Sequence, residues 1–322
     1  MSYLCCPECR AELDLTRVTG SAHVETGELR CSRCGRTYPI VRNIPRFVSS
    51  ENYAVGFGLQ WNLHRRTQLD HYTGRDLSEQ RFFEESKWPR DLAGETVIDA
   101  GSGAGRFTDV AASTDAMVLA LDYSDAVDAN YASNGKRENV LIVQGDIYKM
   151  PFKPADRIFC FGVIQHTPSP RAAFMALPSH VKLGGCVAAD VYLKSFRRYV
   201  LGTKYWVRPL TRRVPPERLY RWTRRYVELM WPVASVVRRI PRVGKVLNWR
   251  LLIADYSDRI GDPKLLREWA YLDTFDMLSP RYDYPQTVET VRRWGRDAGL
   301  GDLEVERCAH GIVIRGRRAS VA

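Results

Sequence analysis

The sequence lacks several features, and each absence narrows the classes of protein to consider. No apolar run approaches the ~18 residues of a membrane-spanning helix, so we expect a soluble chain. The segment from Met1 to Cys5 has no apolar core of a secretory signal, which predicts a cytoplasmic protein in which disulfides are disfavoured. There is no internal repeat and no low-complexity tail. The 322 residues, 45% of them hydrophobic, suit one main domain with small additions.

One segment concentrates glycines directly after a short β-prone run. It reads TVIDAGSGAGRF from Thr96, so that Asp99 is followed by Gly101, Gly103 and Gly105. A β-carbon at these glycines would keep the backbone from turning sharply and lying against a ligand. The pattern predicts a strand, a tight turn and a helix N-terminus that together hold a nucleotide-like molecule.

Further apolar runs end in polar residues, as the strands of a parallel sheet around one crevice would. These runs span residues 118–121, 140–143, 157–161 and 186–190. Asp122 lies 23 residues after Asp99, and an acid about 20 residues past such glycines usually accepts hydrogen bonds from ribose hydroxyls. Asp146 follows the run at 140–143, and His166 lies in the loop after the run at 157–161. The acids and the histidine therefore predict a single binding crevice.

These segments resemble the class I S-adenosylmethionine-dependent methyltransferases through DAGSGAGRF, LALDYS, QGDIYKMPF, GVIQHTP and KLGG. The resemblance implies an α/β, Rossmann-like seven-stranded sheet that is mostly parallel and ends in a C-terminal antiparallel hairpin. Its core would occupy residues 92–193, with the last helix and hairpin in 285–322. Alternatives are a dinucleotide-binding dehydrogenase, which does not explain Gly-Asp-Ile after the third strand, and a domain of this fold without catalysis.

The same resemblance implies a set of cofactor contacts. The glycines would face the methionine part of S-adenosylmethionine, Asp122 would hold the ribose, and Asp146 with Ile147 would flank the adenine. The full set expected in the loops of the core is Asp99, Gly101, Ser102, Gly103, Gly105, Asp122, Tyr123, Asp146, Ile147 and Gly162.

Four cysteines near the N-terminus have the spacing of a metal site. Cys6 and Cys9 form one CxxC pair, Cys31 and Cys34 form another, and 21 residues separate the pairs. Two such pairs supply the tetrahedral thiolate set that Zn²⁺ takes, with Cys5 as an alternative to Cys6. A redox pair or a disulfide is the competing interpretation. Four thiolates leave no open position, so the predicted zinc is structural.

Residues 1–48 resemble the small zinc-ribbon domains related to the activator subunit of tRNA and translation-factor methyltransferases. The segment that follows, residues 49–91, is expected to form a helical cover over the cofactor. Gln60, Trp61 and Gln68 are its candidate contacts.

Residues 194–284 form an insertion after the fifth strand. Between Lys194 and Arg250 there are 16 lysines and arginines against two acids, a net charge of +14. One apolar stripe is expected on its main helix, from Leu219, Trp222, Tyr226, Met230, Val233 and Val237, and Pro232 is expected to kink or split that helix. Three interpretations stay open: a lid with a solvated basic face, a surface for an anionic substrate, and a basic amphipathic helix on a membrane.

Methyl transfer needs a group that accepts the proton of the attacking atom. His166 is the first candidate base, because imidazole titrates near neutral pH. Its alternative role is structural, as a loop residue that holds the backbone in place. Asp273, Asp276 and Asp283 are the next candidates, unless they only pair with neighbouring arginines.

The sequence therefore predicts a methyltransferase whose substrate is an anionic small molecule, glycan or lipid-linked intermediate. An RNA base methyltransferase is the rival enzyme, and an adaptor that binds no cofactor and acts through the ribbon is the third hypothesis. The methyl acceptor and the oligomeric state are not determined by the sequence.

Overall fold

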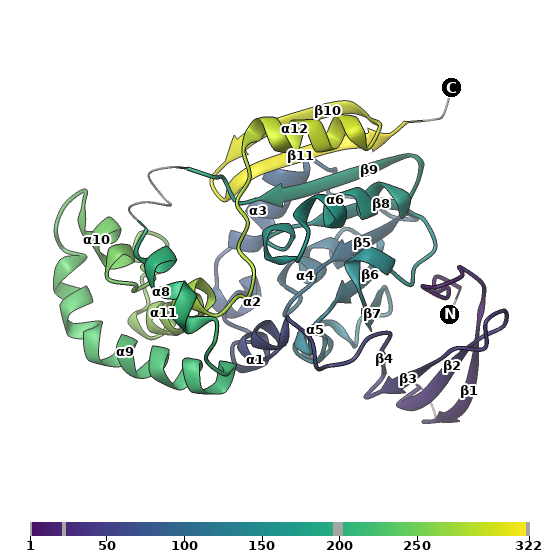
Figure 1. The fold of residues 1–322 in the computed structure, drawn as a ribbon, viewed down its shortest axis with the longest axis horizontal. Helices are drawn as coiled ribbons and strands as arrows, with labels where there is room; N and C mark the ends of the chain where they lie inside the picture. The colour runs from purple at the N-terminus through teal and green to yellow at the C-terminus, as the bar shows by residue number, and fades with distance from the viewer. Residues whose placement is uncertain (1, 21–23, 196–201, 320–322) are drawn as a thin grey trace.

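The computed structural model describes residues 2–20, 24–195 and 202–319, and a seven-stranded sheet forms its centre (Figure 1). The strand order is β10-β11-β9-β8-β5-β6-β7, with β5 to β9 parallel and β11 antiparallel to both neighbours. The bounds are β5 Thr96–Ala100, β6 Met117–Asp122, β7 Val140–Gln144, β8 Ala155–Cys160, β9 Val181–Val191, β10 Leu300–Cys308 and β11 Gly311–Arg318. The predicted Rossmann-like sheet with its antiparallel hairpin is confirmed.

Helices cover both faces of the sheet, because alternate strand side chains point to opposite sides and both sets are apolar. The core helices are α3 Leu77–Ser86, α4 Arg106–Ala112, α5 Ala126–Asn134, α6 Pro170–Ser179 and α12 Val288–Asp297. Ile98 and Leu119 share a buried cluster with side chains of α6 and α12. Val97 and Phe159 face the other way, into a cluster with side chains of α3 and α4.

The N-terminal residues form a separate antiparallel sheet at one end of the molecule (Figure 1). Its strands are β1 Leu13–Thr19, β2 Thr26–Cys31, β3 Thr37–Val41 and β4 Ile44–Pro45. Leu4 pairs with Phe152, and the Arg10 guanidinium donates to the carbonyls of Met150 and Phe152 at 2.8 and 2.5 Å. Leu4 and Phe152 also belong to one buried cluster. The small sheet is therefore packed onto the core rather than tethered beside it.

The insertion is a helical lobe at the opposite end of the molecule (Figure 1). Its described helices are α8 Thr203–Thr211, α9 Pro216–Val237, α10 Gly244–Arg250 and α11 Pro263–Leu278; residues 196–201 of the predicted insertion lie outside the described part. No helix in the described ranges combines the length and hydrophobicity needed to cross a bilayer.

α9 departs in part from the predictions. It runs as one helix through Pro232, so the predicted split does not occur. Its buried side chains are Leu219, Thr223, Val227 and Ala234, of which only Leu219 belongs to the predicted stripe. Trp222 is 53% exposed. The inward side is rotated from the predicted one because the helix packs on α11, where Val227 and Ala234 meet Ala270.

The acidic and aromatic segment after the basic stretch is largely helical. Asp262 accepts a hydrogen bond from the Lys264 N–H, and Pro263 occupies the first turn of α11, so this helix begins with a favourable cap. Trp269, Asp273 and Asp276 consequently recur at helical spacing instead of lying on a rim loop. On the N-terminal side, α1 Val55–Leu63 and α2 Asp70–Thr73 lie in the segment that is predicted to cover the cofactor.

Candidate active site

A cavity of about 250 Å³ lies at the carboxyl ends of the parallel strands. The turn after β5 forms one wall, and Gly101 and Gly103 adopt φ values of +96° and +53° there. A β-carbon at Gly101 would come within 2.4 Å of Val163, and one at Gly103 would lie 3.3 Å from the Trp61 indole nitrogen. The N–H groups of Gly101 and Ser102 donate to the Leu121 carbonyl at 2.7 and 2.9 Å, which ties the turn to β6.

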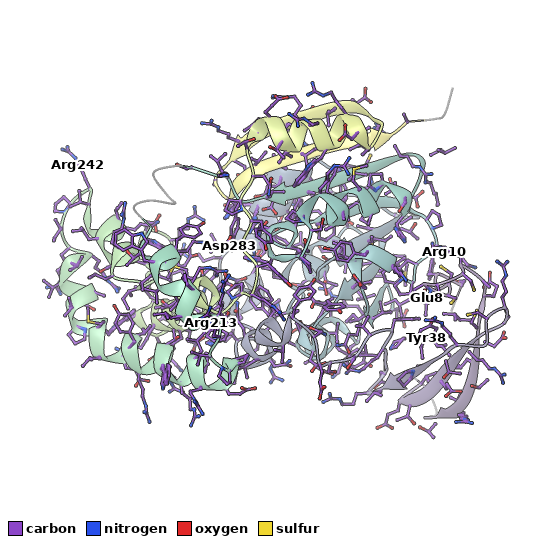
Figure 2. All side chains as sticks on the ribbon, viewed as in Figure 1. Glu8, Arg10, Tyr38, Arg213, Arg242 and Asp283 are labelled. Atoms are coloured by element: carbon purple, nitrogen blue, oxygen red, sulfur yellow. The ribbon has the colours of Figure 1, made fainter. Side chains whose placement is uncertain are left out.

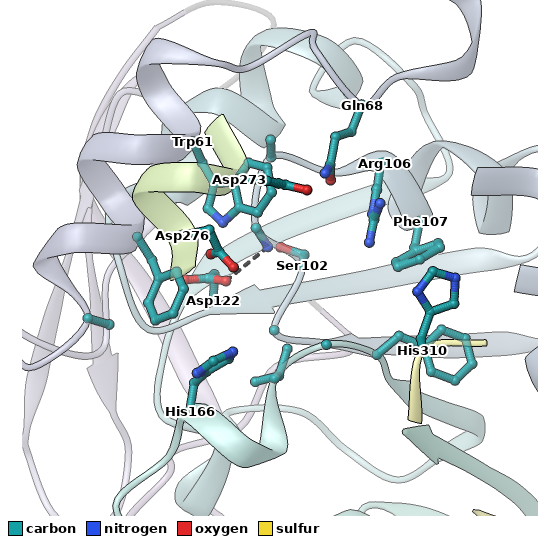
Figure 3. A pocket seen from close by; sticks show the side chains of 18 of the residues that line it. Trp61, Gln68, Ser102, Arg106, Phe107, Asp122, His166, Asp273, Asp276 and His310 are labelled. Atoms are coloured by element: carbon teal, nitrogen blue, oxygen red, sulfur yellow. Dashed lines mark hydrogen bonds between the residues drawn. The ribbon is translucent and has the colours of Figure 1, made fainter. Parts of the chain in front are cut away.

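Asp122 ends β6 and lines the same cavity. One carboxylate oxygen accepts the Gly103 N–H at 2.9 Å (Figure 3), and the other accepts the Ser124 N–H and hydroxyl at 2.8 and 2.7 Å. Burial raises the pKa of Asp122, against these hydrogen bonds. The oxygen shared with Gly103 keeps a lone pair for a hydroxyl donor from a ligand.

Only some of the residues that are predicted to lie near the adenine line the cavity. Ile147 and Tyr123 line it, and Tyr53 stacks on Tyr123 with ring centroids 5.0 Å apart. Asp146 does not line the cavity: its carboxylate accepts the Tyr148 N–H at 2.9 Å. Burial raises the pKa of Asp146.

Asp99 and Gly105 lie behind the turn rather than at the cavity surface. Asp99 is 2% exposed and accepts the Thr108 hydroxyl at 2.7 Å, and burial raises its pKa to about 7. A β-carbon at Gly105 would come within 2.2 Å of the Asn130 side chain. Both residues therefore shape the turn, which is a different role from the predicted contact with the cofactor.

Two polar atoms at the cavity have no hydrogen-bond partner among the residues that the structure describes. Trp61 and Gln68 of the cover line the cavity, and the Gln68 side-chain oxygen is buried without a hydrogen bond, as is the hydroxyl of Ser102 in the turn. Gln60 does not line the cavity; its amide donates to Asp276 at 3.0 Å. Unsatisfied buried polar atoms are costly, so they favour a bound ligand that completes them.

α11 forms the wall opposite the turn. Asp273 and Asp276 line the cavity, and the Tyr256 hydroxyl donates to Asp273. Burial, with the nearby Asp276 carboxylate, raises the pKa of Asp273 to about 7. A carboxylate with this pKa can take up and release a proton near neutral pH.

His166 lies in the short 3-10 helix Ile164–His166 after β8. Its Nδ1 lies 3.0 Å from the Tyr282 carbonyl oxygen, so Nδ1–H donates and Nε2 is left as an acceptor. Its ring packs between Phe57 and Tyr192, with centroids 5.3 and 5.4 Å away. His166 also lines the cavity, so it both holds backbone and presents a basic nitrogen.

Asp283 is not brought to this cavity. Its carboxylate lies 3.1 Å from the Lys204 Nζ and 3.9 Å from the Arg208 Nε. The segment after α11 leaves the helix axis at Ser279, so Asp283 does not continue the row of Asp273 and Asp276. Of the four predicted base candidates, three line the cavity.

A basic corner was missed by sequence reasoning. Arg106, Arg259 and His310 line the cavity, and Figure 3 shows Arg106 and His310 across it from Asp276 and His166. Burial and the neighbouring arginines lower the pKa of His310 to about 3 and that of Arg106 to about 10. Arg106 makes no side-chain hydrogen bond or ion pair with the residues that the structure describes. The position of Arg106 directly after Gly105 could have indicated its place at the cavity. His310 could not be found in this way, because it lies in the β10–β11 hairpin, far from the turn in the sequence.

The predicted metal ligands converge. The sulfurs of Cys6, Cys9, Cys31 and Cys34 all lie within 4.8 Å of one another. Cys6 to Cys34 is 3.7 Å and Cys9 to Cys31 is 3.4 Å, close to the edge of about 3.8 Å in a tetrahedron with Zn–S bonds of about 2.3 Å. Cys5 does not belong to this set of converging sulfurs, and its N–H donates to the Pro151 carbonyl of the core at 2.9 Å. These four residues fit Zn²⁺.

Comparison with known families agrees with this geometry. Residues 98–189 match the methyltransferase domain, and residues 1–43 match the Trm112p-like protein family. The chain thus carries a methyltransferase domain of the S-adenosylmethionine-binding fold. That domain follows a Trm112p-like domain with a four-cysteine cluster able to bind zinc, as predicted.

Similarity to individual proteins is low. The ubiquinone biosynthesis O-methyltransferase of Methylococcus capsulatus is 24% identical over 148 residues, which cover 41% of this chain and 62% of that protein. The chain therefore spans less than two thirds of the length of this curated relative.

Three solved structures illustrate the range of structural similarity. Human N-acetylserotonin methyltransferase in complex with S-adenosylmethionine is 14% identical to this chain, with a TM-score of 0.40. The match covers 83% of this chain and 56% of the human protein chain. A Burkholderia thailandensis O-methyltransferase family protein has 12% identity and a TM-score of 0.45, covering 84% and 72%. The Haloferax volcanii complex of the Trm112 methyltransferase activator and a candidate methyltransferase has 13% identity and a TM-score of 0.44, covering 85% and 100%.

Proposed function

We propose that the protein transfers a methyl group from S-adenosylmethionine to a small acceptor that carries an anionic group. The observation that supports this most directly is one cavity lined both by the glycine turn with Asp122 and by the acids of α11. The unpartnered Ser102 hydroxyl and Gln68 oxygen, and the space kept by Gly103, support the binding of a cofactor in this cavity.

Each wall has its own part in this proposal. Gly101, Gly103 and Asp122 would hold the cofactor, which supplies an electrophilic methyl group on a sulfonium with a good leaving group. Trp61 and the rest of the cover exclude water, and positioning then accounts for much of the barrier reduction. Asp146 and Gln60 would act by fixing their neighbours.

Two groups can take the acceptor proton. His166 Nε2 is the first, because its tautomer is fixed by the Tyr282 carbonyl. Asp273 is the second, because its pKa of about 7 suits a base near neutral pH. The unpaired Arg106 beside Arg259 supports an acceptor with a carboxylate or phosphate, since a guanidinium binds either group through two hydrogen bonds.

Calorimetry with S-adenosylmethionine tests the first half, and mass spectrometry of candidate acceptors with isotopically labelled cofactor tests the second. We expect cofactor binding, and transfer to acidic acceptors that Arg106→Gln impairs through KM. The matched control is Arg75→Gln, on an exposed arginine outside the cavity. No heat and no thermal shift would instead favour the adaptor hypothesis.

An RNA methyltransferase is the second candidate, favoured by the Trm112p-like match and the +14 stretch. It requires RNA affinity that falls steeply with added salt. Absence of RNA binding at low salt would end it.

A further inference from the structure

The outward side of α9 carries an exposed apolar stripe. Trp222, Leu229, Val233 and Val236 are 53%, 77%, 45% and 65% exposed. With Tyr226 they are spaced alternately by four and three residues, so they share one side of the helix. This side is not the one that packs on α11, where Val227 and Ala234 are buried.

Other helices of the lobe carry further exposed apolar residues. Trp206 and Leu210 on α8 are 64% and 69% exposed, and Val246 and Leu247 on α10, which packs against α9, are 55% and 41% exposed. Single exposed apolar residues need no explanation, but the five residues that share one side of α9 form a stripe, and such a stripe indicates a surface that meets an apolar partner.

Arginines without partners accompany the stripe. Arg218, Arg221 and Arg225 lie next to it on α9, on the side away from the buried residues. Four more belong to the ends of the lobe: Arg212, Arg213, Arg239 and Arg242. None of the seven makes a side-chain hydrogen bond or ion pair within the described ranges. Figure 2 labels Arg213 and Arg242 in this lobe, away from the small N-terminal sheet.

We propose that the outward side of α9 docks on an anionic lipid bilayer, with its apolar stripe in the headgroup region and its arginines on the lipid phosphates. An apolar stripe beside a basic strip is the pattern of an interfacial helix. The charge of this surface complements anionic lipids, each arginine adding to the attraction. The proposal goes beyond the methyltransferase assignment and rests on no residue of the cavity.

Other partners fit the surface less well. A second copy of the chain would bring seven uncompensated arginines against seven more. Single-stranded RNA uses rows of aromatic side chains as stacking platforms, whereas Trp222 and Tyr226 are the two aromatic members of this stripe and Leu229, Val233 and Val236 are aliphatic.

Vesicle sedimentation with the full chain tests the proposal. We expect binding to vesicles of phosphatidylglycerol and phosphatidylcholine, little binding to phosphatidylcholine alone, and a loss of binding with added salt. Replacing Arg218, Arg221 and Arg225 by glutamine should weaken binding about fivefold per residue, about 100-fold together. The control replaces three exposed arginines outside the lobe, Arg75, Arg293 and Arg307, and should bind as the parent does.

The apolar contribution needs its own variant. Leu229→Ser with Val236→Ser should weaken binding about tenfold, while Leu183→Ser, at a 61% exposed leucine in β9, should not. All replaced side chains are exposed, so equal melting temperatures will show that the variants fold. Equal binding to neutral and anionic vesicles, no binding to either, or an unchanged triple-arginine variant would overturn the proposal. The proposal would also be overturned if the protein bound no vesicles but dimerised or bound RNA, and if the same substitutions abolished that interaction.

Discussion

Replacing Asp122 by alanine should weaken S-adenosylmethionine binding more than any other single change at the turn. The side chain has two expected tasks: to accept ribose hydroxyls, and to accept the N–H groups of Gly103 and Ser124. A hydrogen bond to a charged acceptor contributes about 1.5–3 kcal/mol, so losing the hydroxyl contacts should cost about 3 kcal/mol, or roughly 150-fold in Kd. Asp122→Asn keeps the shape and one acceptor, and should cost about tenfold.

Calorimetry of both variants measures these affinities, and thermal unfolding without ligand measures the separate loss of the backbone contacts. Ser124→Ala is the matched control, because it removes one partner of Asp122 without touching the cavity lining. If Asp122→Ala binds S-adenosylmethionine as tightly as the parent, the assignment of this carboxylate to the ribose is refuted.

Three further predictions concern metal, pH and catalysis. Chelation, or Cys31→Ser, should unfold the small N-terminal sheet and also lower the melting temperature of the core, because Leu4 and Phe152 share a cluster; an unchanged core transition in calorimetry would contradict this. The pKa of Asp99 is raised from about 3.8 to about 7, so the folded form binds the proton more tightly and stability falls as pH rises through that interval. Asp99→Asn should therefore gain about 2–4 kcal/mol over the parent at about pH 8 and nothing near pH 4 in urea unfolding. Replacing His166 by glutamine should cut kcat more than cofactor affinity; an unchanged kcat would transfer the role to Asp273.

The sheet, the glycine turn and the cysteine set were predictable because each depends on local chemistry. Apolar runs that end in acids specify parallel strands, and two CxxC pairs specify one point in space. The contacts of the cover with the cavity were only partly predictable, since Gln60 and Trp61 are adjacent in sequence and point to different partners.

What failed depended on tertiary packing. The inward side of α9 is set by α11, a partner that helical periodicity does not identify. His310 and Arg106 meet only because the last hairpin returns beside β9, so no spacing along the chain relates them.

The docking of the small N-terminal sheet has a consequence for solubility. β7 is the last strand of the large sheet, and its free side would offer unpaired backbone groups to another molecule. Phe47 donates its N–H to the Gln144 carbonyl at 2.8 Å, and Arg46 pairs with the same residue. A chain shortened to begin after Val48 would leave the edge of β7 unpaired and would expose Phe152 to solvent. We expect this shortened chain to aggregate.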